Sequence, residues 1–301
     1  MIRRLTLWAA LAAVLWFAVF WWLTEPILVL PSPGAFTAPD LANGREMFLL
    51  GGCSSCHAVP EQPDKTRLVG GLALRTAFGT FRVPNISPDP KDGIGAWTEA
   101  QFVAALTLGV SPRGTHYYPA FPYPSYALMT ARDLHDLFAY LKTLPAVRNQ
   151  VPGHDLSFPY NIRRLVGLWK LLYLDGLPFQ PDPVRSAQWN RGAYLVNGPG
   201  HCAECHSPRN WLGAVIAAER FTGGPSPDGH GGVPNITQAK LGAWSEAEIA
   251  RVLLDGEPRD SDKVGGNMLE VVRNTAQTSA QDRAAIAAYI KTLPPAEGRG
   301  R

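Results

Sequence analysis

The chain has 301 residues, of which 46% are hydrophobic and 18% are charged, and this balance excludes a chain that is disordered throughout. Its 28 basic and 25 acidic residues leave a net charge of only +3, whereas nucleic-acid binding needs clustered basic faces. Four cysteines in a chain of this length cannot form a dense disulfide framework. We therefore expect a globular protein of about two domains, with no nucleic-acid partner.

The N-terminus carries a long apolar run. Residues 5–23 contain no charge, and Arg3 and Arg4 precede them. As a helix rising about 1.5 Å per residue, this run nearly spans the roughly 30 Å hydrocarbon core of a bilayer. The alternative is a cleaved signal peptide, whose apolar region is normally shorter. We predict an uncleaved anchor over 1–25 and a proline-rich tether over 26–39. By the positive-inside rule, the rest of the chain then lies in the bacterial periplasm, held by a single pass through the inner membrane.

The remaining sequence repeats itself. Cys53 and Cys202 begin two matching motifs, so the offset is 202 − 53 = 149 residues. Four pieces recur in the same order: G-C-S-S-C-H with H-C-A-E-C-H, V-P-N-I, G-A-W, and L-K-T-L-P with I-K-T-L-P. The repeat predicts two homologous domains, 40–148 and 186–298, joined by a linker at 149–185.

Helical signals dominate both repeats. Residues 133–144 and 281–293 carry apolar residues at helical spacing, with Thr130 and Ser279 as the expected N-caps. Pro145 and Pro294 should end these helices. No alternating run is long enough to predict a sheet. The expected fold class is therefore mainly α, with two tandem domains after a transmembrane helix.

The predicted linker should contain one helix of its own. Residues 162–174 place apolar side chains at helical spacing. Two interpretations stay open for this segment. It is either a strut packed between the domains or a docking surface for a partner or for the membrane.

The two C-x-x-C-H motifs carry the chemistry. Two thiols three residues apart on one helical turn can reach the two vinyl groups of one haem, and the following His can bind its iron. Zinc is the competing interpretation, but a structural zinc site needs two more Cys or His ligands nearby. A redox C-x-x-C motif would not need the trailing His. The sequence thus predicts two covalently bound haem c groups. The residues expected to bind them are Cys53, Cys56, His57, Cys202, Cys205 and His206.

These motifs give the chain a resemblance to the dihaem class I cytochromes c, which occur as membrane-anchored electron-transfer proteins or as cytochrome subunits of bacterial periplasmic dehydrogenases. The segments Y-Y-P-A-F-P-Y-P-S-Y at 117–126, R-G-A-Y-L-V at 191–196 and C-H-S-P-R-N at 205–210 add to it. The resemblance implies two small all-α domains, Met as the usual sixth iron ligand, and transfer of single electrons.

The chain offers few distal ligands for the two irons. Met268 lies in a G-G-N-M segment, expected to be a loop, before the terminal helix, and we predict that it binds the second iron. Met129 lies just before the terminal helix of the first repeat, and we predict that it binds the first. The two positions do not align, so His116 stays a rival ligand for the first iron. Met47, six residues before Cys53, is expected to pack in the core.

Trp97 and Trp244 occupy matching places after Gly-Ala. Each indole N–H could bond a haem propionate while the ring closes the pocket, and simple core packing is the alternative. Asn85 and Asn235 occupy matching places in V-P-N-I, where they are expected to fix the loop on the proximal side.

Three functions are compatible with these sequence features. The leading one is an electron carrier between a periplasmic or membrane dehydrogenase, or a quinol-oxidising enzyme, and a downstream cytochrome or terminal oxidase. Two protein ligands on each iron leave no position for a substrate, which argues for transfer rather than catalysis. The second is an enzyme with one open haem, such as a dihaem peroxidase or a thiosulfate-oxidising cytochrome. The third, a purely structural membrane subunit, does not explain two intact haem motifs.

Overall fold

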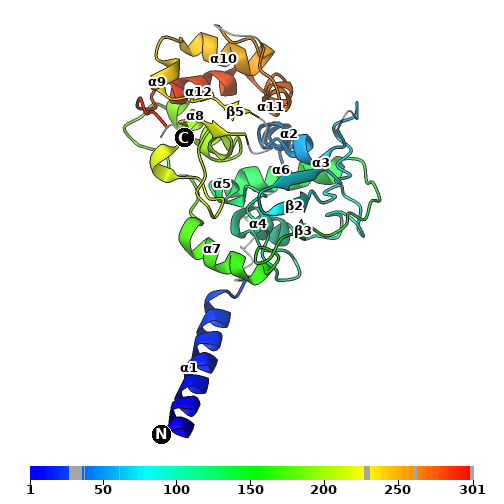
Figure 1. Cartoon of the computed structure of the whole chain (residues 1–301). Helices are drawn as coiled ribbons and strands as arrows, with labels where there is room; N and C mark the ends of the chain where they lie inside the picture. Colours follow the sequence, from blue (N-terminus) through cyan, green and yellow to red (C-terminus); the bar gives the residue numbers. More distant parts are fainter. Residues whose placement is uncertain (27–35, 37, 61, 227–230, 260–262, 299–301) are drawn as a thin grey trace.

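The structure is a computed structural model, and it describes residues 1–26, 36, 38–60, 62–226, 231–259 and 263–298. Most of the predicted tether at 26–39 lies outside the described residues. Helices hold 45% of the chain, which confirms the mainly helical class. Figure 1 shows a helical body from which one long helix projects.

The projecting helix is α1 (Ile2–Leu23). None of its residues is buried. It is long and apolar enough to cross a membrane, with a mean hydropathy of 1.9 over its most apolar window. The predicted helix over the N-terminal apolar run is thus present.

The N-terminal part of the body is built around two packed helices. Its helices are α2 (Leu41–Leu50), α3 (Cys53–His57), α4 (Glu99–Leu108), α5 (Tyr123–Tyr126) and α6 (Ala131–Thr143). Helix α2 packs along α6. The close crossing requires a glycine, because a Cβ on Gly44 would lie 2.2 Å from the carbonyl oxygen of Asp136.

The C-terminal part repeats this arrangement. Its elements are α8 (Ala187–Asn197), η2 (Cys202–Glu204), η3 (Ala217–Glu219), α9 (Gln238–Leu241), α10 (Glu246–Asp255), α11 (Met268–Thr275) and α12 (Ala280–Ile290). Helix α8 packs along α12 as α2 does along α6. Again a glycine permits the crossing, since a Cβ on Gly192 would lie 1.9 Å from the carbonyl oxygen of Ala285.

The expected helix caps are present. Thr130 accepts a hydrogen bond from the backbone N–H of Asp133, and Ser279 accepts one from that of Asp282. Helices α6 and α12 end before Pro145 and Pro294. Local signals in the sequence therefore set the ends of both terminal helices.

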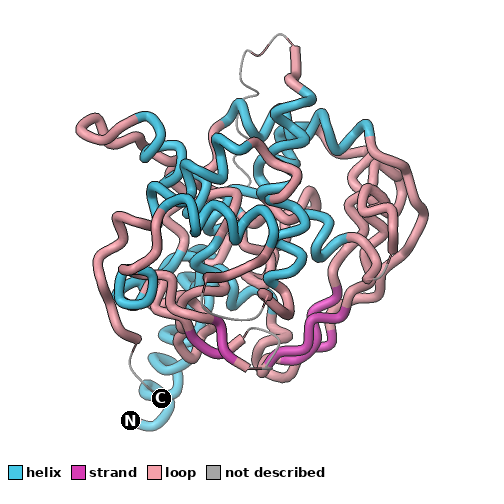
Figure 2. Tube along the Cα trace, turned by 90° about the horizontal axis from the view of Figure 1, so that it is seen from above, coloured by secondary structure: helices cyan, strands magenta, loops and turns pink. Residues whose placement is uncertain are grey.

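A small sheet corrects the expectation that the chain has none. Strands β1 (Ala73–Thr76) and β2 (Gly79–Arg82) form an antiparallel hairpin, and β3 (Asp155–Leu156) pairs with β2. A second pair joins β4 (Gly224–Pro225) to β5 (Gly232–Val233). These strands have two to four residues, too few for an alternating pattern to reveal them. Figure 2 shows them at the edge of the helical body.

The segment between the two parts forms η1 (Arg163–Leu165) and α7 (Val166–Tyr173). The predicted helix at 162–174 is therefore present, with its first turn as a 3-10 helix. In Figure 1, α7 lies at the base of the body, directly above the end of α1.

The two parts pack on one another. A single core cluster includes Met47 and Met129 from the first part and Tyr194 and Ile286 from the second. The buried hydroxyl of Tyr194 donates a hydrogen bond to Asp133, which ties α8 to the start of α6. This polar link and the shared apolar core join the two parts.

Candidate haem sites

The first C-x-x-C-H motif forms α3, which begins after Gly52 in a left-handed conformation, φ 58°. At its end, His57 Nδ1 lies 2.7 Å from the carbonyl oxygen of Pro84. A carbonyl oxygen can only accept, so Nδ1 carries the proton and the lone pair of Nε2 is left for a metal. Burial lowers the pKa of His57 to about 4, so the ring is neutral at pH 7.

The second motif repeats this geometry. Cys202 opens the 3-10 turn η2, and Cys205 and His206 follow it. His206 Nδ1 lies 2.8 Å from the carbonyl oxygen of Pro234, and burial lowers the pKa of this His as well. Both motifs thus present a neutral imidazole that is held through Nδ1.

The asparagines of the repeated V-P-N-I segment hold the loops that carry these prolines. Asn85 Nδ2 donates to the carbonyl oxygen of Val147 at 2.7 Å. Asn235 Nδ2 donates to that of Ala296, also at 2.7 Å. Each amide bridges the loop to the segment that follows the terminal helix. This is the loop-fixing role that the sequence predicted for them.

The donor set fits haem c. Each motif places two thiols and one neutral His on a single turn, with the outer nitrogen of the His already bonded, as metal-binding imidazoles usually are. In the part of the chain that the structure describes, no three His, Cys, Asp or Glu side chains gather as a metal-ion site. The two thiols and the neutral His of each motif are the donors that covalent attachment of haem c uses.

The structure brings the two motifs into contact, which the sequence did not predict. His201, just before Cys202, has its Nε2 3.4 Å from the carbonyl oxygen of Gly51. Its ring centroid lies 5.7 Å from that of Tyr126. Asn274 of α11 bonds both serines of the first motif: Ser54 Oγ donates to its Oδ1 at 3.3 Å, and its Nδ2 donates to Ser55 Oγ at 3.0 Å. No signal in the sequence pairs these segments.

Of the predicted distal ligands, Met129 lies in the core and Met268 packs against it. Met129 is buried, 2% exposed, in the turn between α5 and α6, and Met268 is half-buried against the same core cluster. Met268 is the first residue of α11, so the expectation of a loop there was wrong. The segment that follows is helical because Val272 and Thr275 recur on one buried face. Met47 is fully buried, as expected.

His116 is engaged elsewhere. It is buried, 4% exposed, and its Nε2 donates to the backbone carbonyl of Thr24 at 2.9 Å. Thr24 is the residue that caps the C-terminal end of α1. The structure therefore places the rival ligand at the junction between the body and α1.

Trp97 and Trp244 are half-buried and pack against the core cluster. Two lysines, whose roles the sequence analysis missed, hold the loops beside them. Lys142 Nζ donates to the carbonyl oxygens of Ile94 and Gly95, and Lys291 Nζ donates to those of Leu241 and Gly242. The recurrence of L-K-T-L-P as I-K-T-L-P was the available signal.

Comparison with known proteins identifies the family. The cytochrome c family model matches residues 41–145. A dihaem cytochrome c-type protein of Cereibacter sphaeroides is 48% identical over 278 residues, covering 92% of this chain and 93% of that protein. The chain belongs to the dihaem cytochrome c family.

Further relatives are named as cytochrome subunits of dehydrogenases. The fructose dehydrogenase cytochrome subunit of Gluconobacter japonicus is 33% identical, covering 88% of this chain and 54% of the relative. The cytochrome c subunit of the quinone-dependent alcohol dehydrogenase of Gluconacetobacter polyoxogenes is 34% identical. That match covers 84% of this chain and 55% of the relative. The chain thus spans about half the length of these two relatives. The chain itself is an electron-transfer protein rather than a catalytic enzyme.

Proposed function

We propose that this dihaem cytochrome passes single electrons from a periplasmic or membrane dehydrogenase to a downstream cytochrome or terminal oxidase. The observation that carries the proposal is the repeated His–Pro arrangement at two motifs in contact, His57 with Pro84 and His206 with Pro234. Haem c, when bound, supplies one-electron chemistry at its iron. A quinol-oxidising enzyme is the alternative donor.

The chain's own residues hold and orient the two groups. Cys53 and Cys56 attach the first haem and Cys202 and Cys205 the second, with His57 and His206 as the proximal ligands. Met129 and Met268 are the proposed distal ligands, and each indole of Trp97 and Trp244, which packs against the core, would close a haem pocket and would donate its N–H to a propionate. The bond from His116 to Thr24 supports Met129 over His116, because it holds the His116 ring against the residue that follows α1.

The proposal includes two cytochrome c domains, 40–148 and 186–298, with 149–185 between them. Their matched construction supports this division. Each has a glycine at its helix crossing, Gly44 or Gly192, and an asparagine-held proximal loop. Each therefore has the parts for one haem.

The anchor is proposed to stay on the mature protein and to cross the bacterial inner membrane, with the haem domains in the periplasm. The C-terminal end of the anchor packs against the body. Cleavage near this end would break the contacts that Thr24 makes with Arg164 and Gly167. Thr24 is fully buried, and its hydroxyl accepts a hydrogen bond from Arg164 Nε at 2.9 Å. A Cβ on Gly167 would lie 2.7 Å from the Cα atom of Thr24.

A dehydrogenase is the proposed donor because two of the relatives are named as cytochrome subunits of fructose and alcohol dehydrogenases. Their identities of 33–34% over more than four-fifths of this chain support a shared way of receiving electrons. Which dehydrogenase serves this chain can be tested by purifying it from its own membranes with its partner.

The test is a haem count followed by a transfer assay. Acid-acetone extraction should leave the colour on the full chain, and the pyridine haemochrome should give two haems per chain. The Cys202→Ala and Cys205→Ala double variant should give one. The reduced protein should be oxidised rapidly by a soluble cytochrome in stopped flow, with no steady-state turnover of peroxide or thiosulfate. For the wild-type chain, extractable haem, a count of one haem per chain, or sustained turnover of peroxide or thiosulfate would overturn the proposal.

A further inference from the structure

Helix α7 is arranged in the reverse of an ordinary surface helix. Its outward side chains are leucines: Leu168, Leu171 and Leu172 are 36%, 61% and 68% exposed. Its single charged residue, Lys170, points inward, where Nζ donates to the carbonyl oxygen of Leu108 at 2.6 Å and to that of Gly109 at 2.7 Å. A soluble surface helix normally turns its charges outward and its leucines inward.

Neighbouring segments extend the apolar surface. Trp169 Nε1 donates to the carbonyl oxygen of Leu212 at 3.1 Å, and Asn210 Nδ2 donates to the hydroxyl of Tyr173 at 3.0 Å. These two bonds fix the loop that presents Trp211, 78% exposed, beside α7. We call the exposed apolar side chains of α7, its two flanks and this loop the α7 face. Its members are Phe158, Ile162, Leu168, Leu171, Leu172, Leu177 and Trp211.

The α7 face adjoins the end of the anchor. Gly167 of α7 packs against Thr24, and Arg164 Nη2 lies 2.6 Å from Glu25 Oε2. The Arg164 guanidinium also lies 4.0 Å from the ring centroid of Trp21. Figure 1 shows α7 directly above α1 with no intervening element.

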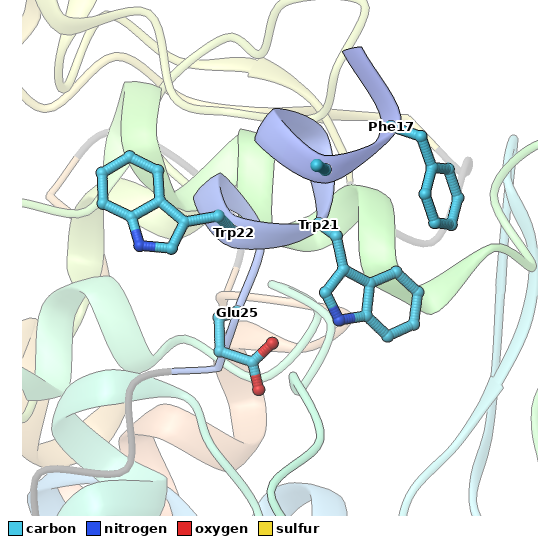
Figure 3. Close-up of a pocket in the computed structure, with 5 residues that line it drawn as sticks. Phe17, Trp21, Trp22 and Glu25 are labelled. Atoms are coloured by element: carbon cyan, nitrogen blue, oxygen red, sulfur yellow. The ribbon is translucent and has the colours of Figure 1, made fainter. Parts of the chain in front are cut away.

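The last turn of the anchor marks the level of the membrane boundary. Trp21 and Trp22 are 51% and 76% exposed, and with Phe17, Ala18 and Glu25 they line a hollow of about 650 Å³. Figure 3 shows the two indoles pointing to opposite sides of the helix. Tryptophans gather where the hydrocarbon core meets the headgroups. The contact between Thr24 and Gly167 therefore sets α7 at the headgroup level.

We propose that the α7 face lies on the membrane, with Leu171 and Leu172 in the boundary between headgroups and acyl chains. The inference rests on the proposed anchor, which must span the bilayer. Exposed apolar side chains gathered along one helix mark an interaction site, and an interfacial helix buries its apolar face in that boundary. A lipid surface is the fitting occupant because the face is continuous with a membrane-spanning helix and bonded to its end. This contact would hold the haem domains in one orientation above the bilayer.

The test places the photoreactive residue p-benzoylphenylalanine at single positions of the full chain in its native membranes. One variant replaces Leu172. A matched control replaces Leu254, a leucine of α10 that is 46% exposed and far from α1 in Figure 1. A second control replaces Leu11, which is 51% exposed in the middle of the anchor. After illumination, mass spectrometry separates lipid adducts from protein adducts.

We expect phospholipid adducts at Leu11 and at Leu172, with a yield at Leu172 several-fold above that at Leu254. Lipid adducts at Leu11 together with only protein adducts at Leu172, or with a Leu172 yield equal to that at Leu254, would overturn the α7 contact and leave the anchor standing. Protein adducts alone at Leu172 would identify a partner protein as the occupant. The absence of lipid adducts at Leu11 would overturn the anchor and, with it, the α7 contact.

Discussion

His201 Nε2 lies 3.4 Å from the carbonyl oxygen of Gly51, so the residue before one C-x-x-C-H motif contacts the residue two before the other. Attachment sites in direct contact suit electron exchange within one chain, because the electron need not cross solvent between them. The hydrogen bonds of Asn274 to Ser54 and Ser55 also join α11 to the first motif and so stabilise this contact.

The variant Asn274→Ala should loosen this contact. Asn274 is buried, 5% exposed, and its loss leaves Ser54 without a partner, a cost of about 1–3 kcal/mol in the free energy of unfolding. Pulse radiolysis should show slower redistribution of electrons between the two haems. The control Gln277→Ala removes an exposed bond to Arg45 and should change neither quantity. Equal exchange rates in Asn274→Ala and wild type would contradict the role of this contact.

Replacing either proposed distal methionine should lower the reduction potential of one haem. Thioether ligation favours ferrous iron, and axial ligands set haem potentials over a range of about 0.8 V, so we expect a drop on the order of 0.1 V. Spectroelectrochemical titration of Met129→Ala and Met268→Ala should each show one shifted and one unchanged potential. Met47→Leu is the control, since it replaces a buried core methionine by a side chain of similar volume. An unshifted Met129→Ala beside a shifted His116→Ala would assign the first iron to His116.

The helix crossing of the second repeat should not tolerate a methyl group. A Cβ at residue 192 would lie 1.9 Å from the carbonyl oxygen of Ala285, so α8 and α12 must separate in Gly192→Ala. Overpacking of this kind costs about 1–3 kcal/mol, and thermal unfolding should show the loss. Gly153→Ala is the matched control because nothing lies within 4 Å of its Cβ position. Equal stability of the two variants would contradict the close crossing.

Local signals made much of this fold predictable. The caps at Thr130 and Ser279 and the stops before Pro145 and Pro294 depend on a few neighbouring residues, and the structure confirms them. The repeat of V-P-N-I also anticipated the loops that Asn85 and Asn235 hold.

Features that depend on distant contacts could not be read from the sequence. The pairing of β3 with β2 joins residues more than seventy positions apart. The bond from His116 to Thr24 joins residues 92 positions apart, so the sequence left His116 open as an iron ligand. The inward turn of Lys170 likewise depends on where α4 ends, which no pattern within α7 reveals.

Lys170 should make the stability of the protein depend on pH above neutrality. Burial lowers the pKa of its ammonium to about 7 from an ordinary 10.5. Nearby His116 has its pKa lowered by burial and by the charges of Lys170 and Arg164, so it is already neutral above pH 7. Between pH 7 and 10.5 the unfolded chain binds more protons at Lys170 than the folded chain does. The free energy of unfolding should therefore rise with pH across this window.

The Lys170→Met variant should lose the pH dependence of the free energy of unfolding that Lys170 causes. Its stability advantage over wild type should be largest at pH 7 and should shrink toward pH 10.5, by an amount on the order of a few kcal/mol once partial solvent screening is allowed for. Denaturant unfolding of the full chain in detergent, followed by far-UV circular dichroism at several pH values, measures the difference. Lys91→Met, which removes an exposed lysine, should keep the wild-type slope. Parallel curves for wild type and Lys170→Met would mean that the two carbonyl bonds of Lys170 fully offset the cost of burying its charge.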